Sequence, residues 1–118
     1  MTEHLVSTGS YTIDVARDFS AYPGGRYARL GPFSGEAFRK EQLEPALQRG
    51  GNVIVILDGA ESYPVSFLEE AFGGLVRVSG YSKSELEQRL KIQASKPRLA
   101  TLRDLAWNYI NKAPAKSK

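Results

Sequence analysis

Five consecutive apolar residues, VIVIL at positions 53–57, constrain the fold more than any other stretch of this sequence. Four of the five are β-branched and no polar residue alternates with them, which is typical of a strand covered on both faces. Residues 11–15 (YTIDV) alternate instead, and this pattern predicts an edge strand. Shorter segments at 26–30 and 91–94 predict two further strands. We therefore expect a sheet of about four strands with residues 53–57 at its centre.

Helical patterns lie between these predicted strands. Ser34 is a candidate N-cap for a helix over residues 34–49, and Pro45 inside it predicts a kink because proline removes one backbone hydrogen bond. A second helix begins at Ser66; a short helix follows it, and a long one starts at Pro97. Strands alternating with helices in a chain of 118 residues predict one α/β (α+β) domain, a mixed sheet with helices packed on it.

Composition excludes several kinds of chemistry. The chain has no cysteine, so disulfides, thiolate zinc sites and cysteine catalysis are excluded. Its one histidine, His4, lies in an N-terminal segment that we expect to be frayed, so neither histidine catalysis nor a metal site is expected. No apolar run approaches the roughly 20 residues of a membrane helix, and residues 1–10 lack the features of a secretory signal. We expect a cytoplasmic protein without a cofactor.

The positive charge is concentrated toward the C-terminus. The formal net charge is +3, and three lysines lie in the segment 112–118, which is rich in small residues and proline. Such a composition predicts a disordered basic tail that follows a domain over residues 1–111. The remaining bases are interspersed with acids. A nucleic-acid accessory role acting through the tail therefore stays an alternative with little support.

A glycine-rich segment, PGGRYARLGPFSGE at 23–36, precedes the first predicted helix. Backbone amides at a helix start can bind a phosphate, and Arg26, Arg29 and Ser34 are candidates to hold such an anion. The segment matches neither the nucleotide-binding P-loop nor the dinucleotide-binding glycine pattern. The other interpretation is a flexible loop followed by a Ser34 cap, and both stay open.

Asp58 follows the predicted central strand, at the end where open α/β sheets present functional groups. One interpretation is a phosphoacceptor, which needs further acids for Mg²⁺ and a helper lysine, with Asp14 and Lys91 as the available residues. The other is a simple Asp-Gly turn, which the pattern favours. An enzyme using Asp58 and the anion loop, for phosphotransfer or nucleotide binding, is thus the catalytic alternative.

Ser66 raises the sharpest question about regulation. Ser66 and Glu69 form an S-x-x-E capping box, in which loss of the hydroxyl costs about 1 kcal/mol. The same position suits a phosphoserine, because a helix start attracts negative charge while the nearby Glu69 repels it. Ser66 is therefore a cap, a phosphorylation site, or both.

Two motifs in this sequence resemble the STAS-like domain family. Residues 66–72 read S-F-L-E-E-A-F, similar to that family's S-F-x-x-E-x-F, and residues 34–39 read S-G-E-A-F-R, with Arg26 upstream. The resemblance covers roughly residues 10–110. It implies a STAS-like fold related to the anti-sigma-factor antagonists of bacterial signalling, in which a serine at the start of the corresponding helix is phosphorylated by a GHKL-type ATPase kinase.

The resemblance assigns roles by position. Ser66 becomes the modified serine and Asp58 the strand-end acid, although Pro64 and Phe67 replace the acid and the glycine of the antagonists' Asp-Ser-Ser-Gly. It implies a non-enzymatic regulatory module that binds a partner protein, a GHKL-type ATPase, without nucleic acid or membrane. We expect the partner to contact the loop after the central strand and the exposed side of the helix at 66–76. The candidate contacts are Asp58, Ser62, Tyr63, Pro64, Glu69 and Glu70.

Overall fold

One sheet of three strands organises the computed structural model, which describes residues 9–116. The strands are β1 (Ser10–Asp14), β2 (Asn52–Ile56) and β3 (Leu90–Gln93), in the order β1-β2-β3, and both neighbouring pairs are parallel. The α/β class and the central place of β2 are confirmed. The expected fourth strand at 26–30 is replaced by a loop with a short 3₁₀ turn, η1 (Ala28–Leu30), so the sheet is parallel throughout rather than mixed.

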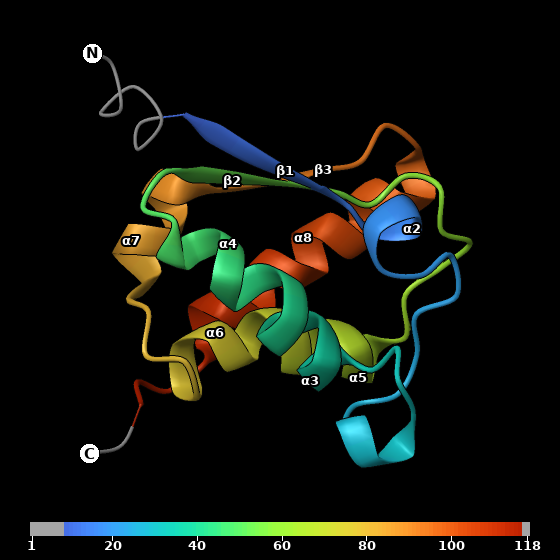
Figure 1. Ribbon diagram of the computed structural model, residues 1–118, viewed down its shortest axis with the longest axis horizontal. Coiled ribbons are helices and arrows are strands. Elements are labelled where there is room, and N and C mark those ends of the chain that lie inside the picture. Colours follow the sequence, from blue (N-terminus) through green and yellow to red (C-terminus); the bar gives the residue numbers. More distant parts are fainter. Residues whose placement is uncertain (1–8, 117–118) are drawn as a thin grey trace.

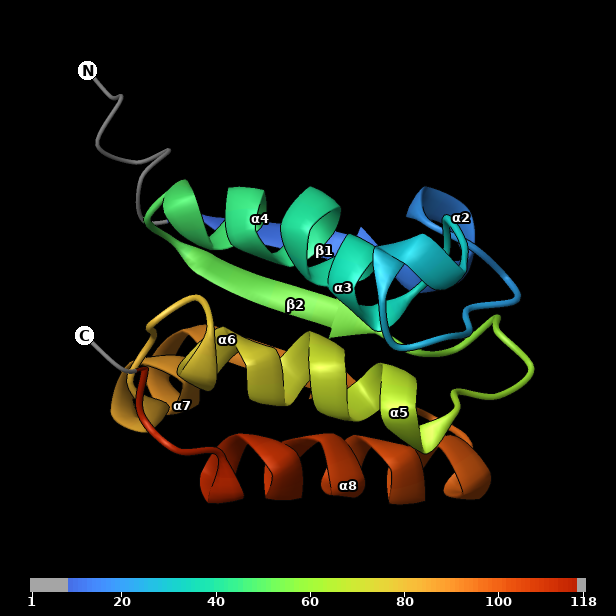
Figure 2. The ribbon, with the colours of Figure 1, turned by 90° about the horizontal axis from the view of Figure 1, so that it is seen from below.

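Three long helices pack on one face of this sheet (Figure 1), and Figure 2 shows them side by side. The first two are continuous but contain a π-helical segment in the middle, and the second lies between the first and the third. Two short helices, α2 (Val15–Asp18) and α7 (Lys83–Arg89), complete the fold. The long helices are α3 (Gly35–Phe38), η2 (Arg39–Leu43) and α4 (Glu44–Gln48); α5 (Val65–Leu68), η3 (Glu69–Gly73) and α6 (Gly74–Arg77); and α8 (Pro97–Lys112).

A proline and a glycine pair, both helix-breaking in the sequence, lie inside continuous helices. Pro45 lies at the start of α4, directly after the π segment η2, so the predicted kink takes the form of a wider turn that tolerates the missing N–H. Gly74 lies where the guanidinium of Arg39 crosses the second helix, and a Cβ there would collide with it. The glycine pair at 73–74 therefore permits a close approach, and the helix continues to Arg77.

The core lies between the sheet and the helices. On β2, Val53 and Val55 point into it and are fully buried, whereas Ile54 and Ile56 on the opposite face are half-buried. Across this second face Ile54 pairs with Thr12 and Lys91, which are exposed. Coverage of β2 on both faces, predicted from its apolar run, is therefore wrong for the part of the chain described here.

Aromatic side chains fill the end of the core nearest the start of α5. Phe38, Phe67 and Phe72 are fully buried, and Phe19 packs edge-on against Phe38 with ring centroids 5.1 Å apart. Tyr63 joins them and donates its hydroxyl to the carbonyl of Leu57 at 2.8 Å. Burial, with smaller effects from nearby carboxylates, raises the pKa of Tyr63 well above its usual range, so this donor stays neutral.

The C-terminal boundary differs from the one predicted at residue 112. Lys112 is the last residue of α8 and Ala113 is buried, so the basic segment begins later than expected. His4 and residues 117–118 lie outside the described residues. Among the helices of residues 9–116, none is both long and apolar enough to cross a membrane.

Gly35 sets how closely the first two long helices approach. A Cβ at this position would lie 2.5 Å from the carbonyl oxygen of Phe67 and 3.2 Å from the backbone nitrogen of Ala71. Because these neighbours are backbone atoms inside a packed helix, they cannot rotate away. The glycine is therefore required by the helix contact, and not by an unusual backbone angle.

We expect Gly35→Ala to destabilise the domain by about 1–3 kcal/mol, because overpacking forces the two helices apart. Gly24→Ala is the matched control, since no heavy atom lies within 4 Å of a Cβ there. Urea unfolding followed by circular dichroism measures both. Equal unfolding midpoints for the two variants would contradict the close contact.

Candidate functional site

The two sequence motifs meet in a buried ion pair. Arg39, the last residue of S-G-E-A-F-R, donates through Nη1 to Glu70 Oε2 at 2.8 Å and to the backbone carbonyl of Glu70 at 2.7 Å. Their side chains are 2% and 6% exposed. A buried charge is tolerated when it is paired and hydrogen-bonded, so each motif supplies the charge that the other needs.

Further charges surround this pair. Glu69 forms ion pairs with Arg26 and with Arg77, whose Nη2 also lies 3.0 Å from Glu70 Oε1. Glu44 lies 3.5 Å from Arg39 Nε. We name the six residues the arginine–glutamate network; its three positive and three negative charges are balanced. The network contains Arg26, Arg39, Glu44, Glu69, Glu70 and Arg77.

The residues of the motif S-G-E-A-F-R at 34–39 make structural contacts. The buried Ser34 hydroxyl accepts from the amide of Ala37 at 3.1 Å, which confirms the predicted N-cap. Glu36 accepts from the amide of Ala28 at 2.8 Å, and this bond lowers the pKa of Glu36. Phe38 belongs to the aromatic core. The motif therefore builds the helix start and fixes the loop before it.

The residues of the predicted anion site, Arg26, Arg29 and Ser34, each have a separate contact within the protein. Ser34 is buried and caps α3, while the charge of Arg26 is compensated by Glu69, whose hydrogen bond raises the pKa of Arg26. Arg29 is exposed, with its guanidinium 5.3 Å from the centre of the Tyr27 ring. The three groups thus make different contacts within the protein.

Ser66 does not cap its helix, contrary to the predicted capping box. Helix α5 begins at Val65 with Pro64 as its N-cap residue, and no side chain caps it. Glu69 cannot return to the amide of Ser66 because its carboxylate binds two guanidinium groups, which are stronger partners than an amide. Ser66 is half-buried in the first turn, and its hydroxyl has no capping role there.

Most of the predicted partner surface lies inside the protein. Residues 67–76 are buried except Glu69, because the first long helix and α8 cover the second helix from either side. Tyr63 and Glu70 are buried as well, so they cannot contact a partner in this conformation. Ser62 and Pro64 are exposed. The accessible part of the predicted surface is thus the loop before α5 and its first turn.

Asp58 joins two loops at the carboxyl ends of β2 and β3. Its carboxylate accepts from the amide of Ser95 at 3.0 and 3.2 Å, and the positive φ of Gly59 (+99°) supports the Asp-Gly turn. Asp58 and Lys91 line a shallow hollow beside the edge of β3, whereas Asp14 caps α2. Within residues 9–116, no group of three acidic, histidine or cysteine side chains is placed to hold a metal.

Sequence reasoning missed Arg77 as a member of the network. It lies two turns after Glu69 and Glu70 on the same helix, and a search for charges on one helical face is the signal that finds it. The exposed apolar side chains of the loop before α3 were missed as well. That loop carries Tyr27, Leu30 and Phe33, and no periodic pattern marks them as exposed.

The fold and the arginine–glutamate network define the class of protein. It is an α/β domain with a parallel sheet and with helices on one face, and a buried ion pair joins the two helices that carry the motifs. Residues 34–98, more than half of the chain, match the family described as a STAS-like domain of unknown function (DUF4325). The chain belongs to this family, which confirms the resemblance carried by the two motifs. No curated protein and no solved structure matches the chain significantly.

We expect Ser66→Ala to change the free energy of unfolding by less than about 0.5 kcal/mol, because no cap is lost. Ser82→Ala is the comparison, since the Ser82 hydroxyl does cap α7 through the amide of Glu85 at 3.0 Å, and its loss costs about 1 kcal/mol. Chemical denaturation measures both. A larger cost at Ser66 than at Ser82 would restore the capping box.

We expect Glu70→Gln to destabilise the domain by about 3 kcal/mol or more, because it removes the carboxylate that is hydrogen-bonded to the buried Arg39 and leaves only the more distant Glu44 to compensate its charge. Glu85→Gln removes the same charge from a more exposed pair with Arg89 and should cost less than about 1 kcal/mol. Thermal and urea unfolding of the two variants give the comparison. Similar stabilities would show that the Arg39–Glu70 pair is not important for the fold.

Proposed function

We propose that this domain is a non-enzymatic signal-transduction module that binds a partner protein near the start of α5, with Ser66 as its phosphorylation switch. The observation that carries the proposal is the state of Ser66. It is the half-buried serine of a family motif, has no capping role, and lies at the accessible end of a helix that is otherwise buried. A hydroxyl at such a position that caps no helix is available for modification.

A phosphate on Ser66 would change the surface without disturbing the core. The continuous helix over residues 65–77 starts beside it, and the free amides at a helix start favour an anion. Glu69, one turn further along, would repel it. Arg26, whose side chain is 32% exposed, would then be attracted by both the phosphate and Glu69. Phosphorylation would thus add charge at the docking surface, and the phosphate would compete with Glu69 for Arg26.

The kind of partner is proposed from the resemblance of STAS-like domains to better-known STAS domains. STAS-like domains resemble the STAS domains of anti-sigma-factor antagonists, in which a GHKL-type ATPase phosphorylates the serine and binds the unmodified surface. We propose the same class of partner here, in the cytoplasm of a bacterial cell. Ser62, Pro64 and Val65 are exposed around Ser66 and form the accessible rim of this surface.

The phosphotransfer alternative has less support. Asp58 accepts from the amide of Ser95, Asp14 caps α2, and the candidate anion loop has its Arg26 paired with Glu69. The nucleic-acid alternative relied on a basic tail from residue 112, and Lys112 belongs to α8. Partner binding at Ser66 needs neither a phosphoacceptor carboxylate nor a basic tail.

A pull-down from cells of the native host tests the proposal, with wild type, Ser66→Glu and the control Ser84→Glu, which adds the same charge at an exposed serine of α7. We expect wild type and Ser84→Glu to retain a GHKL-type ATPase and Ser66→Glu to lose most of it. Mass spectrometry should find acid-stable phosphate on Ser66 after incubation with that ATPase. Equal retention of the ATPase by all three forms would contradict the proposed switch at Ser66. If no form retains a protein, the proposed partner binding is wrong.

A further inference from the structure

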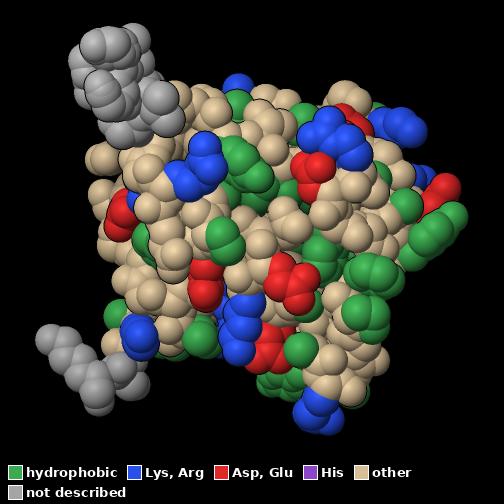
Figure 3. Space-filling model, viewed as in Figure 1, with side chains coloured by type: hydrophobic (Ala, Val, Ile, Leu, Met, Phe, Trp, Pro, Cys, Tyr) green, Lys and Arg blue, Asp and Glu red, His purple; other side chains and the backbone are tan. Residues whose placement is uncertain are grey.

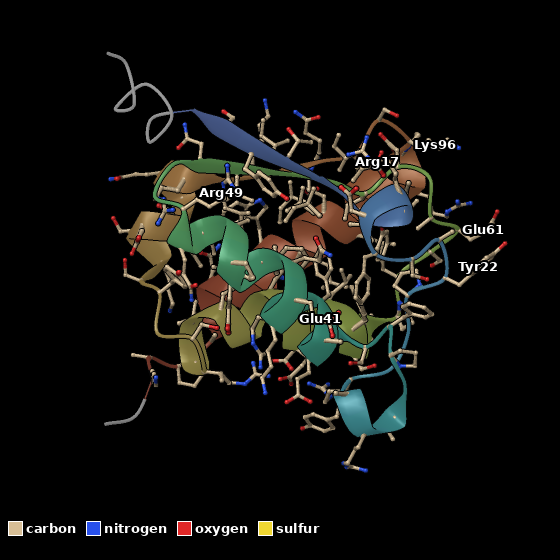
Figure 4. All side chains as sticks on the ribbon, viewed as in Figure 1. Arg17, Tyr22, Glu41, Arg49, Glu61 and Lys96 are labelled. Carbon is tan, nitrogen blue, oxygen red and sulfur yellow. The ribbon has the colours of Figure 1, made fainter. Side chains whose placement is uncertain are left out.

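A lobe formed by residues 22–33 projects from the body of the domain beside α3 and α5 (Figure 1, lower right). Four of its large apolar side chains are exposed: Tyr22 by 78%, Leu30 by 59%, Phe33 by 44% and Tyr27 by 39%. Figure 3 shows apolar side chains along this side of the molecule, and Tyr22, at the start of the lobe, points away from the body in Figure 4. Apolar side chains gathered on one segment are typical of an interaction surface.

Backbone hydrogen bonds close the lobe at its base. Backbone bonds of 2.9 Å run from the amide of Gly24 to the carbonyl of Phe33 and from the amide of Gly35 to the carbonyl of Gly25. Phe33 also packs edge-on against the core residue Phe19, with ring centroids 5.7 Å apart. A surface that is already ordered loses little conformational entropy when it binds.

The lobe lies next to the proposed phosphorylation site. Gly35, two residues after it, touches the backbone of Phe67 in the first turn of α5, and Arg26 of the lobe pairs with Glu69. Val65 is 56% exposed in that same turn. The lobe and the first turn of α5 therefore form one surface, with Ser66 inside it.

The free charge of the lobe is positive. Residues 22–33 contain two arginines and no acid, and Arg26 is compensated by Glu69. Arg29 is exposed, stacks over Tyr27, and forms no ion pair within residues 9–116. The nearby Glu36 is occupied by the amide of Ala28 and by Lys40. The complementary charge on a partner is therefore a carboxylate.

A protein fits this surface better than a membrane or a nucleic acid. One free arginine contributes only about 1 kcal/mol toward an anionic lipid surface, and nucleic-acid binding relies on several phosphate contacts. Tyrosine and arginine are, by contrast, the residue types that dominate the energy of protein interfaces, especially when they surround an apolar centre. Tyr27 and Arg29 lie on the same turn as Leu30 and supply this combination.

We infer that the lobe surface, consisting of Tyr27, Arg29, Leu30, Phe33 and Val65, docks into an apolar pocket of the partner protein that has carboxylates on its rim. This inference rests on the proposed function and names the surface that makes the contact. Leu30 enters the pocket and Arg29 pairs with the rim. Because Arg26 ties the lobe to Glu69, a phosphate on Ser66 acts on the same surface.

The test uses the ATPase retained by wild type in the pull-down, purified and titrated against folded variants by calorimetry. We expect Leu30→Ser and Arg29→Glu each to weaken binding about tenfold or more. The controls Val78→Ser, an exposed apolar residue at the end of α6, and Lys96→Glu, an exposed cation before α8, should bind within about twofold of wild type. Thermal melts confirm that each variant is folded.

The outcomes separate the two proposals. If Leu30→Ser and Arg29→Glu bind like wild type, the lobe is not the docking surface, although partner binding itself stands. If wild type retains no protein, both proposals fail. Two further assays test other occupants of the lobe surface: binding of wild type to phosphatidylglycerol vesicles, and its self-association in light scattering. If either is observed, and Leu30→Ser abolishes it while Val78→Ser does not, the occupant is a membrane or a second copy of the chain, and the proposed partner protein is overturned.

Discussion

The buried ion pair between Arg39 and Glu70 is the contact on which the rest of this structure depends. It joins the first two long helices at their crossing, and each partner would be a costly buried charge without the other. The space for it comes from Gly74, and Gly35 provides the close approach beside it. Motif residues that look like a functional signature in the sequence are thus needed for packing, because they form the contact where the two helices cross.

The same network connects the core to the surface. Glu70 is buried with Arg39, Glu69 is half-buried, and Arg26 extends from them into the lobe. A charge added at Ser66 lies one turn from Glu69 and therefore acts on a contact that positions the lobe. Under the proposed function, a phosphate there would leave the sheet and the aromatic core unchanged, because the ion pairs that would rearrange are the partly exposed ones.

Much of the architecture could be predicted from the sequence, because it depends on local patterns. The apolar run in β2, the Ser34 cap and the start of α8 at Pro97 are each encoded within a few residues, and each is present. Predictions failed where a distant group offers a better partner. Glu69 leaves the capping box for two arginines, and the expected strand at 26–30 is held as a loop by bonds to α3.

The sequence by itself determined three strands and the three long helices, the α/β class, and the two motifs that reveal the STAS-like family. Only the tertiary structure decided what those motif residues do. Arg26, Arg39 and Arg77 come from three separate segments, and nothing in their spacing specifies which carboxylate each one binds. Ion pairing depends on distance in space and on burial, so it was settled when the helices packed, and with it the exposure of Ser66 and of the lobe.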